Sequence, residues 1–248
     1  MSDGWEASVH SWDLSTGVDG PGTRFVLFLS GCPLRCLYCQ NPDTWHMRDG
    51  QRRRLESIME DVELYRRFLK VAGGGVTASG GEPLLQSEFV TRFFRAAREW
   101  ELPTALDTSG HLGLRADEEL LAVTDLVLLD IKSFDPRTYR RLTGEAVGPT
   151  LAFAERLASV GQAMWIRFVL VPGVTDDPEN VAGLAGFAAA LGPAVERVEV
   201  LPFHRLGQHK YDALRLPFPL ADTEPPDDAL IRRVVGQFAD QGLPVLSA

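Results

Sequence analysis

The sequence predicts an α/β protein: a partial (β/α)6 barrel of the TIM type, with a mostly parallel sheet that is open laterally. Short apolar segments alternate with longer amphipathic segments along the 248 residues, as in successive strand–helix units. The short segments are apolar through most of their length, which is typical of parallel strands covered on both faces. Six such units are too few for a complete eight-stranded barrel.

A third observation favours a barrel over a flat, doubly wound sheet. Polar residues stand at or just beyond the ends of different expected strands; they are Ser79, Asp107, Asp130, Arg167 and His204. In a barrel the strand ends meet at one mouth, which is where the active sites of barrels lie. In a flat sheet the same residues would be spread along an edge.

Each expected strand is an apolar run, and each expected helix follows one of these runs. The strands are expected at residues 24–29, 76–79, 104–108, 126–131, 164–171 and 195–201, with a short terminal segment at 245–246. The helices are expected at residues 55–71, 86–100, 116–123, 136–142, 150–160, 179–191 and 227–241. In the first helix, apolar residues recur at spacings of three or four. The segment Gly73-Gly74-Gly75 is expected to end that helix.

Composition excludes some classes of partner. The formal net charge is −9, which argues against nucleic acid or an anionic membrane as the main partner. The basic run Arg52-Arg53-Arg54 is interpreted as a solvated face. The first residues lack the cationic and apolar regions of a signal peptide, and the apolar run at residues 25–29 is too short to span a bilayer. We therefore expect a cytoplasmic protein, and we expect it to be a monomer.

All three cysteines lie within eight positions, as Cys32, Cys36 and Cys39 in the pattern C-x3-C-x2-C. They fall in an expected loop, residues 31–45, after the first strand. Clustered cysteines in a reducing compartment indicate metal or redox use before disulfides. Three thiolates on an iron–sulfur cluster would leave one iron open, and the spacing favours this interpretation. The alternative is a zinc site completed by a histidine, for which the candidates are His46, His204 and His209.

Tyr38 precedes the third cysteine, and with it the motif resembles the signature of the radical S-adenosylmethionine (SAM) superfamily. The resemblance implies a single radical SAM domain over residues 1–248. It implies a [4Fe–4S] cluster on Cys32, Cys36 and Cys39, with SAM as co-substrate on the open iron. The segment Ser79-Gly80-Gly81-Glu82 resembles the superfamily's GGE segment, which contacts the amino group of SAM. Taken alone, the same segment is an ordinary junction between a strand and a helix.

Further SAM contacts are expected at strand ends. A single Asp at a strand end is usually a helix cap or a turn former. Two on neighbouring strands, Asp107 and Asp130, could instead bind a nucleoside ligand or a hard, monovalent cation. Lys132 suits a carboxylate. A lone histidine is more often structural, and for His204 the strand-end position makes a contact with the adenosine an equal alternative. The complete expected set of SAM contacts is Tyr38, Cys39, Gln40, Gly80, Gly81, Glu82, Asp107, Asp130, Ile131, Lys132 and His204.

The resemblance extends nearly end to end to the activases of glycyl radical enzymes. It is carried by the segments at residues 17–22, 41–45, 73–82, 165–167 and 201–211. No cysteines are present for the additional ferredoxin-like insert of several related activases, which favours the pyruvate formate-lyase type. The resemblance implies that reduced flavodoxin or ferredoxin supplies an electron and that SAM is cleaved to a 5′-deoxyadenosyl radical. That radical would take a hydrogen atom from a glycine of pyruvate formate-lyase.

This chain departs from the family pattern at three positions. Gln40 follows the third cysteine where His is common, Ser109 stands where Asn is common, and Ala105 stands where some members have Cys. None of these changes removes an expected cluster ligand. The substitution at Gln40 is the one that could alter the cluster or its SAM contacts.

Two residues are candidates for binding the loop of the partner enzyme that carries the glycine. They are Asp19, in a glycine-rich segment, and Arg167. For Asp19, a role as a turn residue is an equal alternative. Three other functions stay open from the sequence: activation of a different glycyl radical enzyme, radical SAM chemistry on a small molecule, and a zinc-stabilised binding module without catalysis.

Overall fold

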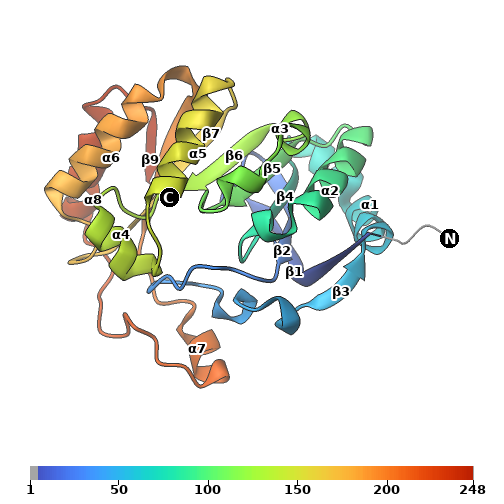
Figure 1. Cartoon of the computed structure of the whole chain (residues 1–248), viewed down its shortest axis with the longest axis horizontal. Helices are drawn as coiled ribbons and strands as arrows, with labels where there is room; N and C mark the ends of the chain where they lie inside the picture. Colours follow the sequence, from blue (N-terminus) through green and yellow to red (C-terminus); the bar gives the residue numbers. More distant parts are fainter. Residues whose placement is uncertain (1–4, 248) are drawn as a thin grey trace. The chain divides into compact units, whose positions relative to one another are not determined.

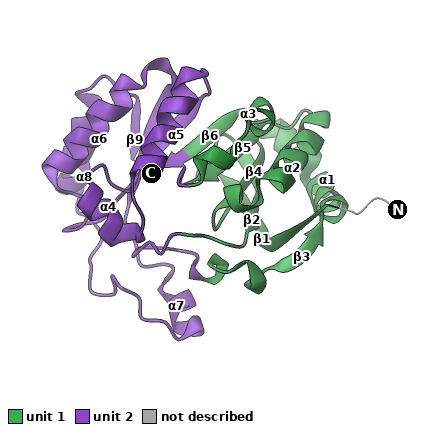
Figure 2. Cartoon of the chain, viewed as in Figure 1, with its two compact units in different colours: residues 1–33, 43–108, 112–128 green, residues 34–42, 109–111, 129–248 purple. Residues whose placement is uncertain are grey.

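The structure is a computed structural model that describes residues 5–247. The chain forms two compact units (Figure 2). The first unit contains the residues up to 33, with 43–108 and 112–128, and the second contains residues 34–42, 109–111 and those from 129 on. Strand β6 (Leu126–Asp130) passes from the first unit into the second. The expectation of a single domain stays a prediction.

The first unit is built on a sheet with the strand order β3-β1-β2-β4-β5-β6. Its strands before β6 are β1 (Glu6–Thr16), β2 (Thr23–Leu29), β3 (Gln51–Arg54), β4 (Gly75–Gly80) and β5 (Thr104–Thr108) (Figure 1). Strands β2, β4 and β5 are parallel, as predicted. Strands β1 and β3 are antiparallel to their neighbours and were not predicted. They were missed because many of their side chains are polar and exposed, as edge strands allow.

The second unit continues from the end of β6 through β7 (Met164–Leu170), β8 (Val195–Pro202) and β9 (Val245–Ser247). The pairs β7–β8 and β8–β9 are parallel. The predicted strands of this unit are confirmed to within a residue or two. No helix within residues 5–247 is long and apolar enough to cross a membrane.

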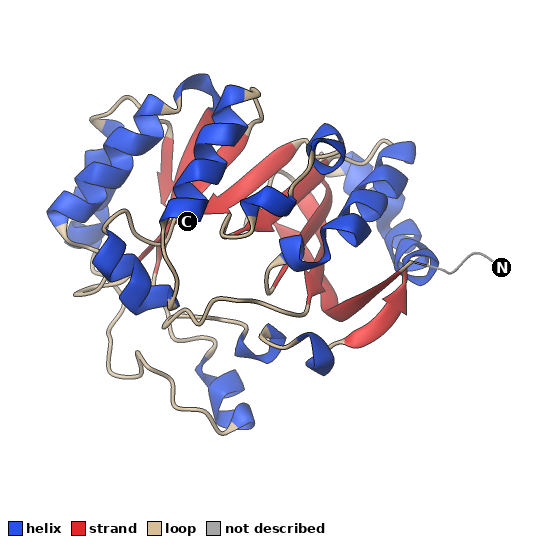
Figure 3. Ribbon diagram, viewed as in Figure 1, coloured by secondary structure: helices blue, strands red, loops and turns tan. Residues whose placement is uncertain are grey.

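The helices follow the predicted ones closely (Figure 3). Those of the first unit are α1 (Leu55–Val71), α2 (Ser87–Glu99) and α3 (Glu118–Ala122). Those of the second unit are α4 (Pro136–Thr143), α5 (Gly148–Ser159), α6 (Pro178–Ala190), α7 (Gln208–Leu214) and α8 (Asp228–Ala239). Helix α7 was not predicted. The expected helix at residues 86–100 begins with a separate 3-10 turn, Pro83–Gln86.

The two faces of the first unit's parallel strands differ in polarity because side chains alternate along each strand. Phe25 of β2 is buried, stacks on Trp12 of β1, and lies on the face that α1 covers. The opposite face carries polar side chains: Arg24 Nε donates to Thr77 Oγ1 at 3.0 Å, and Ser79 Oγ donates to Asp107 at 2.6 Å. One face therefore forms the hydrophobic core, and the other presents hydrogen-bonding groups.

The three glycines at the end of α1 have two different roles. Gly73 has a φ of +61° and ends the helix, as predicted. Gly74 and Gly75 instead allow close packing at the amino ends of the parallel strands. A Cβ at Gly74 would lie 1.7 Å from the carbonyl oxygen of Thr23, and one at Gly75 would lie 1.9 Å from that of Pro103. The segment predicted to end the helix therefore also allows β4 to pack closely on its neighbours.

Gly75→Ala is expected to lower the free energy of unfolding by at least about 2 kcal/mol, because the new methyl group forces backbone apart where β4 and β5 begin. Urea denaturation of the metal-free protein measures this. Gly186→Ala is the matched control: Gly186 lies inside α6, and a Cβ there meets nothing within 4 Å. The control should gain roughly 0.5–1 kcal/mol from helix propensity. Equal stability of Gly75→Ala and the native chain would contradict the close approach.

Candidate functional site

In the first unit, the turn after β4 packs directly on the start of the cysteine loop. Gly81 N donates to Leu29 O at 2.8 Å, and Glu82 N donates to Gly31 O at 2.8 Å. A Cβ at Gly80 would lie 2.4 Å from Leu29 N, and one at Gly81 would lie 2.2 Å from Gly31 O. Glycine is therefore required at both positions by the chain's own backbone. The sequence left two interpretations of these glycines open, a contact with SAM and an ordinary junction between a strand and a helix.

Glu82 is fully buried and is held by two hydrogen bonds. Its carboxylate accepts from Thr108 Oγ1 at 2.6 Å and from Leu84 N at 3.2 Å, which caps the following 3-10 turn. The side chain thus joins the carboxyl ends of β4 and β5. A contact between Glu82 and SAM stays a prediction.

Asp107 lies beside this turn, at the carboxyl end of β5. It is partly exposed, and its carboxylate accepts a 2.6 Å hydrogen bond from Ser79 Oγ of β4. Asp107, Gly80, Gly81 and Glu82 are therefore gathered at one edge of the first unit's sheet, as the positions of the strand ends predicted.

Asp19 lies toward the other end of the same strands. Thr77 Oγ1 donates to Asp19 O at 2.8 Å, and Thr77 stands four residues before Gly81. At about 3.3 Å per residue, Thr77 and Gly81 lie roughly 13 Å apart along the strand direction. Asp19 is thus not part of the group at the carboxyl ends.

Arg24 holds the Asp19 segment on this face of the sheet. It is 1% exposed and donates to Thr77 Oγ1 and to Pro103 O, each at 3.0 Å. Burial lowers the pKa of Arg24 to about 10, although the negative charges of Asp125 and Asp19 act to raise it. The guanidinium therefore stays charged at neutral pH, and it fixes the backbone near Asp19.

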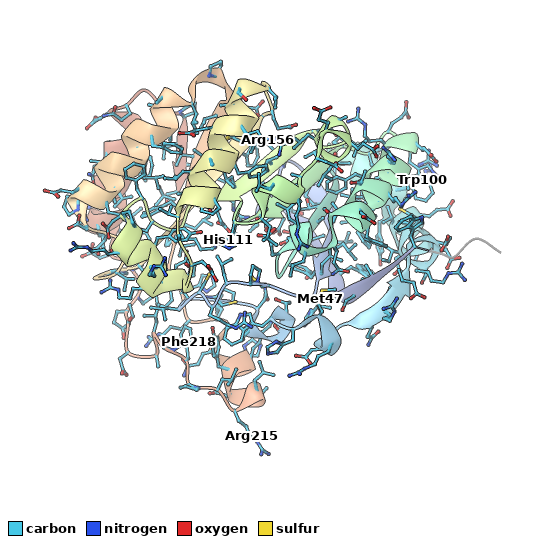
Figure 4. The ribbon with its side chains drawn as sticks, in the orientation of Figure 1. Met47, Trp100, His111, Arg156, Arg215 and Phe218 are labelled. Atoms are coloured by element: carbon cyan, nitrogen blue, oxygen red, sulfur yellow. The ribbon has the colours of Figure 1, made fainter. Side chains whose placement is uncertain are left out.

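Backbone hydrogen bonds hold the cysteine loop along its length. In the first unit, Gly31 N donates to Thr44 O at 2.7 Å and Cys32 N donates to Trp45 O at 3.0 Å. A side chain at position 31 would also crowd Met47 (Figure 4), since a Cβ there would lie 2.6 Å from its Sδ. The two ends of the loop are thus joined without any metal.

The central part of the loop belongs to the second unit. Arg35 N donates to Thr143 O and Leu37 N donates to Leu142 O, each at 2.9 Å, so the loop runs along the end of α4. Cys39 N donates to Cys36 O at 3.1 Å and forms a turn between the last two cysteines. None of the three cysteines is in a disulfide, and all three are partly exposed.

The thiols have the chemistry of cluster ligands, but burial opposes ionisation of Cys36. Desolvation raises the pKa of Cys36 to about 12, partly offset by Lys132. Metal binding at Cys36 must therefore release a proton. Three cysteines without a fourth fit an iron–sulfur cluster that keeps one iron open. Within residues 5–247, no three His, Cys, Asp or Glu side chains are grouped so as to hold a metal ion.

Tyr38, Asp130 and Lys132 form a compact group beside Cys36 in the second unit. Lys132 Nζ lies 3.2 Å from Asp130 Oδ2 and 5.5 Å from the centre of the Tyr38 ring. Desolvation favours the neutral amine, but Asp130 and Tyr38 outweigh it and raise the pKa of Lys132 well above its usual value. Ile131, between them, is buried and donates its N–H to Arg167 O at 3.1 Å. The structure thus brings together four of the residues predicted to contact SAM.

Gln40 and His204, also predicted to contact SAM, are joined in the second unit. Gln40 Nε2 donates to His204 O at 3.2 Å, and Gln40 Oε1 accepts from Gly207 N at 2.7 Å. The His204 side chain is exposed, and its Nδ1 accepts from Leu206 N at 3.3 Å. No local sequence pattern indicates this connection, because its partners are more than 160 residues apart.

Arg167 is buried on β7 and faces a carboxylate that the sequence did not single out. Arg167 and Glu199 are paired across β7 and β8, with Nε and Oε2 at 3.6 Å. Arg197 Nη1 lies 3.6 Å from the other oxygen of Glu199. Desolvation raises the pKa of Glu199, while both arginines oppose that change. A buried guanidinium beside a buried carboxylate on the neighbouring strand is an unusual arrangement that a sequence without its strand register does not reveal.

The predicted site residues are thus divided between the two units. The first unit holds Asp19, Cys32, Gly80, Gly81, Glu82 and Asp107. The second unit holds Cys36, Tyr38, Cys39, Gln40, Asp130, Ile131, Lys132, Arg167 and His204.

Comparison with protein families and curated proteins gives extensive matches. The model of the radical SAM superfamily matches residues 26–185. Pyruvate formate-lyase 1-activating enzyme of Escherichia coli (strain K12) is 43% identical over 241 residues, 96% of this chain and 97% of that protein. Pyruvate formate-lyase-activating enzyme of Listeria monocytogenes is 40% identical over 229 residues, 90% of this chain and 92% of that protein.

Solved structures share the fold. A domain of pyruvate-formate lyase-activating enzyme from Bacteroides vulgatus matches with a TM-score of 0.59 and 25% identity, over 71% of this chain and 99% of that chain. A radical SAM methyltransferase from Sphaerobacter thermophilus matches with a TM-score of 0.67 and 19% identity, over 95% of this chain and 72% of that chain. The latter likeness concerns the fold alone. The predicted fold class, an open partial barrel with a mostly parallel sheet, is confirmed.

Asp130→Asn is expected to lower the free energy of unfolding by about 3 kcal/mol at pH 8, because the buried ammonium of Lys132 loses its counter-charge. The raised pKa of Lys132 sets the sign of the pH dependence. The stabilisation that Lys132 gains in the folded chain is fully present below the pKa of an unfolded lysine, roughly 10.4. It is lost as the pH rises through the higher pKa of Lys132 in the folded chain. The difference between the variant and the native chain should therefore shrink above about pH 10.4. Urea denaturation of the metal-free protein across this range measures it.

Glu101→Gln is the matched control for that experiment. Glu101 also pairs with a lysine, Lys70, at 2.6 Å, but its side chain is 84% exposed. This variant should unfold like the native chain, since exposed ion pairs contribute little. An Asp130→Asn variant as stable as this control would show that the Lys132 pair is not a buried interaction.

Proposed function

The chain belongs to the radical SAM superfamily and, within it, to the family of the pyruvate formate-lyase-activating enzymes, and we propose that it generates the glycyl radical of pyruvate formate-lyase. One observation carries this proposal. The chain retains the C-x3-C-x2-C motif while matching activating enzymes over nearly the whole length of both proteins. The family implies a [4Fe–4S] cluster and SAM.

The cluster and SAM, when bound, supply the radical chemistry: one-electron cleavage of SAM and removal of a hydrogen atom from the partner's glycine. Cys32, Cys36 and Cys39 would hold the cluster and leave one iron open for SAM. The residues of the chain then have to bind, orient and shield. No proton-transfer group is required of them.

The residues proposed to contact SAM fall into two groups. At the carboxyl ends of β4 and β5, backbone groups of Gly80 and Gly81 and the carboxylates of Glu82 and Asp107 would meet SAM. The second group provides the charged ammonium of Lys132, which suits the SAM carboxylate. Its remaining contacts would be Tyr38, Cys39, Gln40, Asp130, Ile131 and His204, with His204 on the adenosine.

A monovalent cation near Asp107 and Asp130 is a secondary part of the proposal. Carboxylate oxygens suit a hard cation. Lys132 already places a positive charge 3.2 Å from Asp130, so charge balance at Asp130 does not require a cation.

An external electron donor is part of the proposal, because the three cysteines of the chain cannot hold a second cluster. Reduced flavodoxin or ferredoxin would serve. Three cysteines that form no disulfide suit a reducing, cytoplasmic setting. We expect the chain to act as a monomer that meets its protein partner transiently.

Arg167 is the better supported of the two residues proposed to bind the partner's glycine loop. Its guanidinium is fixed by Glu199, which lowers the conformational cost of binding a peptide carbonyl or carboxylate. Asp19 would act at a separate level, toward the amino ends of the first unit's strands, where Arg24 and Thr77 hold its backbone.

Anaerobic incubation with SAM, reductant and pyruvate formate-lyase should produce a glycyl radical doublet in the EPR spectrum of the partner. Cys36→Ala should bind little iron and reduce SAM cleavage at least about 100-fold, because a cluster ligand is lost. A signal with another glycyl radical enzyme, but not with this one, would assign the chain to that partner. SAM-dependent product formation from a small molecule without a protein partner would replace the proposal. A colourless zinc protein would contradict any radical SAM function.

Arg167→Lys is expected to raise KM for the partner about tenfold with little change in kcat. Lysine cannot reproduce the planar guanidinium contact, and a hydrogen bond to a charged group contributes roughly 1.5–3 kcal/mol. Arg232→Lys, on the exposed side of α8, is the control and should leave both constants unchanged. A variant with normal KM would remove Arg167 from the partner site.

A further inference from the structure

Gln40 makes three hydrogen bonds that join the cysteine loop to the segment 203–211, which follows β8. Its Oε1 accepts from Gly207 N at 2.7 Å. Its Nε2 donates to His204 O and to Tyr38 O, each at 3.2 Å. One side-chain amide thus satisfies two backbone groups of segment 203–211 and one of its own loop. All of these residues belong to the second unit.

The fit between Gln40 and Gly207 is close enough to require glycine. A Cβ at position 207 would lie 2.7 Å from Gln40 Oε1 and 3.0 Å from Gln40 Cα. Gly207 has a φ of −75°, so any residue could adopt its backbone conformation. Space beside Gln40, rather than backbone strain, therefore explains a glycine at this position.

A second polar contact joins the same two segments. Lys210 Nζ donates to Asn41 Oδ1 at 2.7 Å, one residue beyond Gln40. Beyond these polar contacts, segment 203–211 is anchored by aromatic packing. Tyr211 is 1% exposed, and the Phe218 ring lies 4.9 Å from it and 6.4 Å from the Phe203 ring (Figure 4).

The His204 side chain, in contrast, is exposed, and its Nδ1 accepts a local hydrogen bond from Leu206 N. Its position depends on its backbone, and Gln40 holds the carbonyl of that residue. Removing Gln40 would release the turn at 204–207 while the aromatic anchors at its two ends remain.

We propose that Gln40 is a positioning residue that latches segment 203–211 to the cysteine loop and so sets the position of His204 for SAM. The latch itself is a property of the fold. Its effect on SAM rests on the proposed function, in which His204 contacts the adenosine. The glutamine that departs from the common family residue thereby acquires a specific partner, Gly207.

Hydrogen exchange at the Gly207 amide tests the latch in the intact, cluster-loaded chain under anaerobic conditions. Gln40→Ala should increase exchange in a peptide spanning 203–211 roughly tenfold, because the acceptor of Gly207 N–H is lost. Trypsin should then cleave faster after Arg205 and Lys210. Gln40→Glu keeps an acceptor for Gly207 N–H but loses the donor to His204 O and Tyr38 O, so it should retain part of the protection of Gly207. Gln241→Ala, at an exposed position after α8, is the control and should exchange like the native chain.

Two results would overturn the latch. One is native protection of residues 203–211 in Gln40→Ala. The other is equal loss of protection in Gln40→Ala and Gln40→Glu, which would show that the accepting oxygen does not hold Gly207. If Gln40→Ala does not fold, Gly207→Ala tests the same contact from the other side. It should loosen the same segment, because its methyl group displaces Gln40 Oε1.

Equilibrium binding of SAM tests the functional half of the proposal. Gln40→Ala should bind SAM roughly three- to tenfold more weakly than the native chain, with unchanged iron content, and Gln40→Glu should recover part of that affinity. Loss of protection without any change in SAM affinity would overturn the role assigned to His204. Failure of the native chain to bind SAM would instead contradict the proposed function and leave the exchange result standing. The two failures are thus distinguishable.

Discussion

Close backbone packing at the carboxyl end of β4 is the constraint that holds the first unit's predicted site residues in place. Two N–H groups, of Gly81 and Glu82, donate to the carbonyls of Leu29 and Gly31 at 2.8 Å. No side chain fits between these strands, because a Cβ at Gly80 or Gly81 would overlap the neighbouring backbone. The position of Cys32, one residue further on, is therefore set by main-chain hydrogen bonds that do not need a metal. A turn proposed to bind SAM and the first cluster ligand are consequently parts of one rigid junction.

Charged groups in both units are buried with partners, in keeping with the cost of an isolated buried charge. Arg24 donates to carbonyl and hydroxyl oxygens, Lys132 lies beside Asp130, and Arg167 lies beside Glu199. Each partner comes from the same strand or an adjacent segment, so these charges are fixed as soon as the strands pair. A preorganised charge binds a ligand without first losing side-chain freedom.

Periodicity and strand-end polarity were sufficient to predict the parallel strands, most helices, and the grouping of Asp107 with Gly80–Glu82. They could not predict β1 and β3, whose polar edge residues lack a clear apolar run. Nor could they predict Glu199 as the partner of Arg167, since that pairing depends on the register between β7 and β8. The same limit applies to Gln40 and Gly207, which are 167 residues apart. Local patterns determine where an element lies, whereas tertiary packing determines which side chains meet.

Three of the described acidic groups are poorly suited to acid–base catalysis. Glu82 accepts hydrogen bonds from Thr108 and Leu84, and burial raises the pKa of Cys36 and of Glu199. General acid–base catalysis needs a titratable group near the operating pH and within reach of the reacting atoms. Homolytic cleavage and hydrogen-atom transfer need no such group. They need a bound cofactor, fixed charges and a shielded space. A fold that contains rigid backbone junctions and paired charges is therefore suited to the radical chemistry proposed for it.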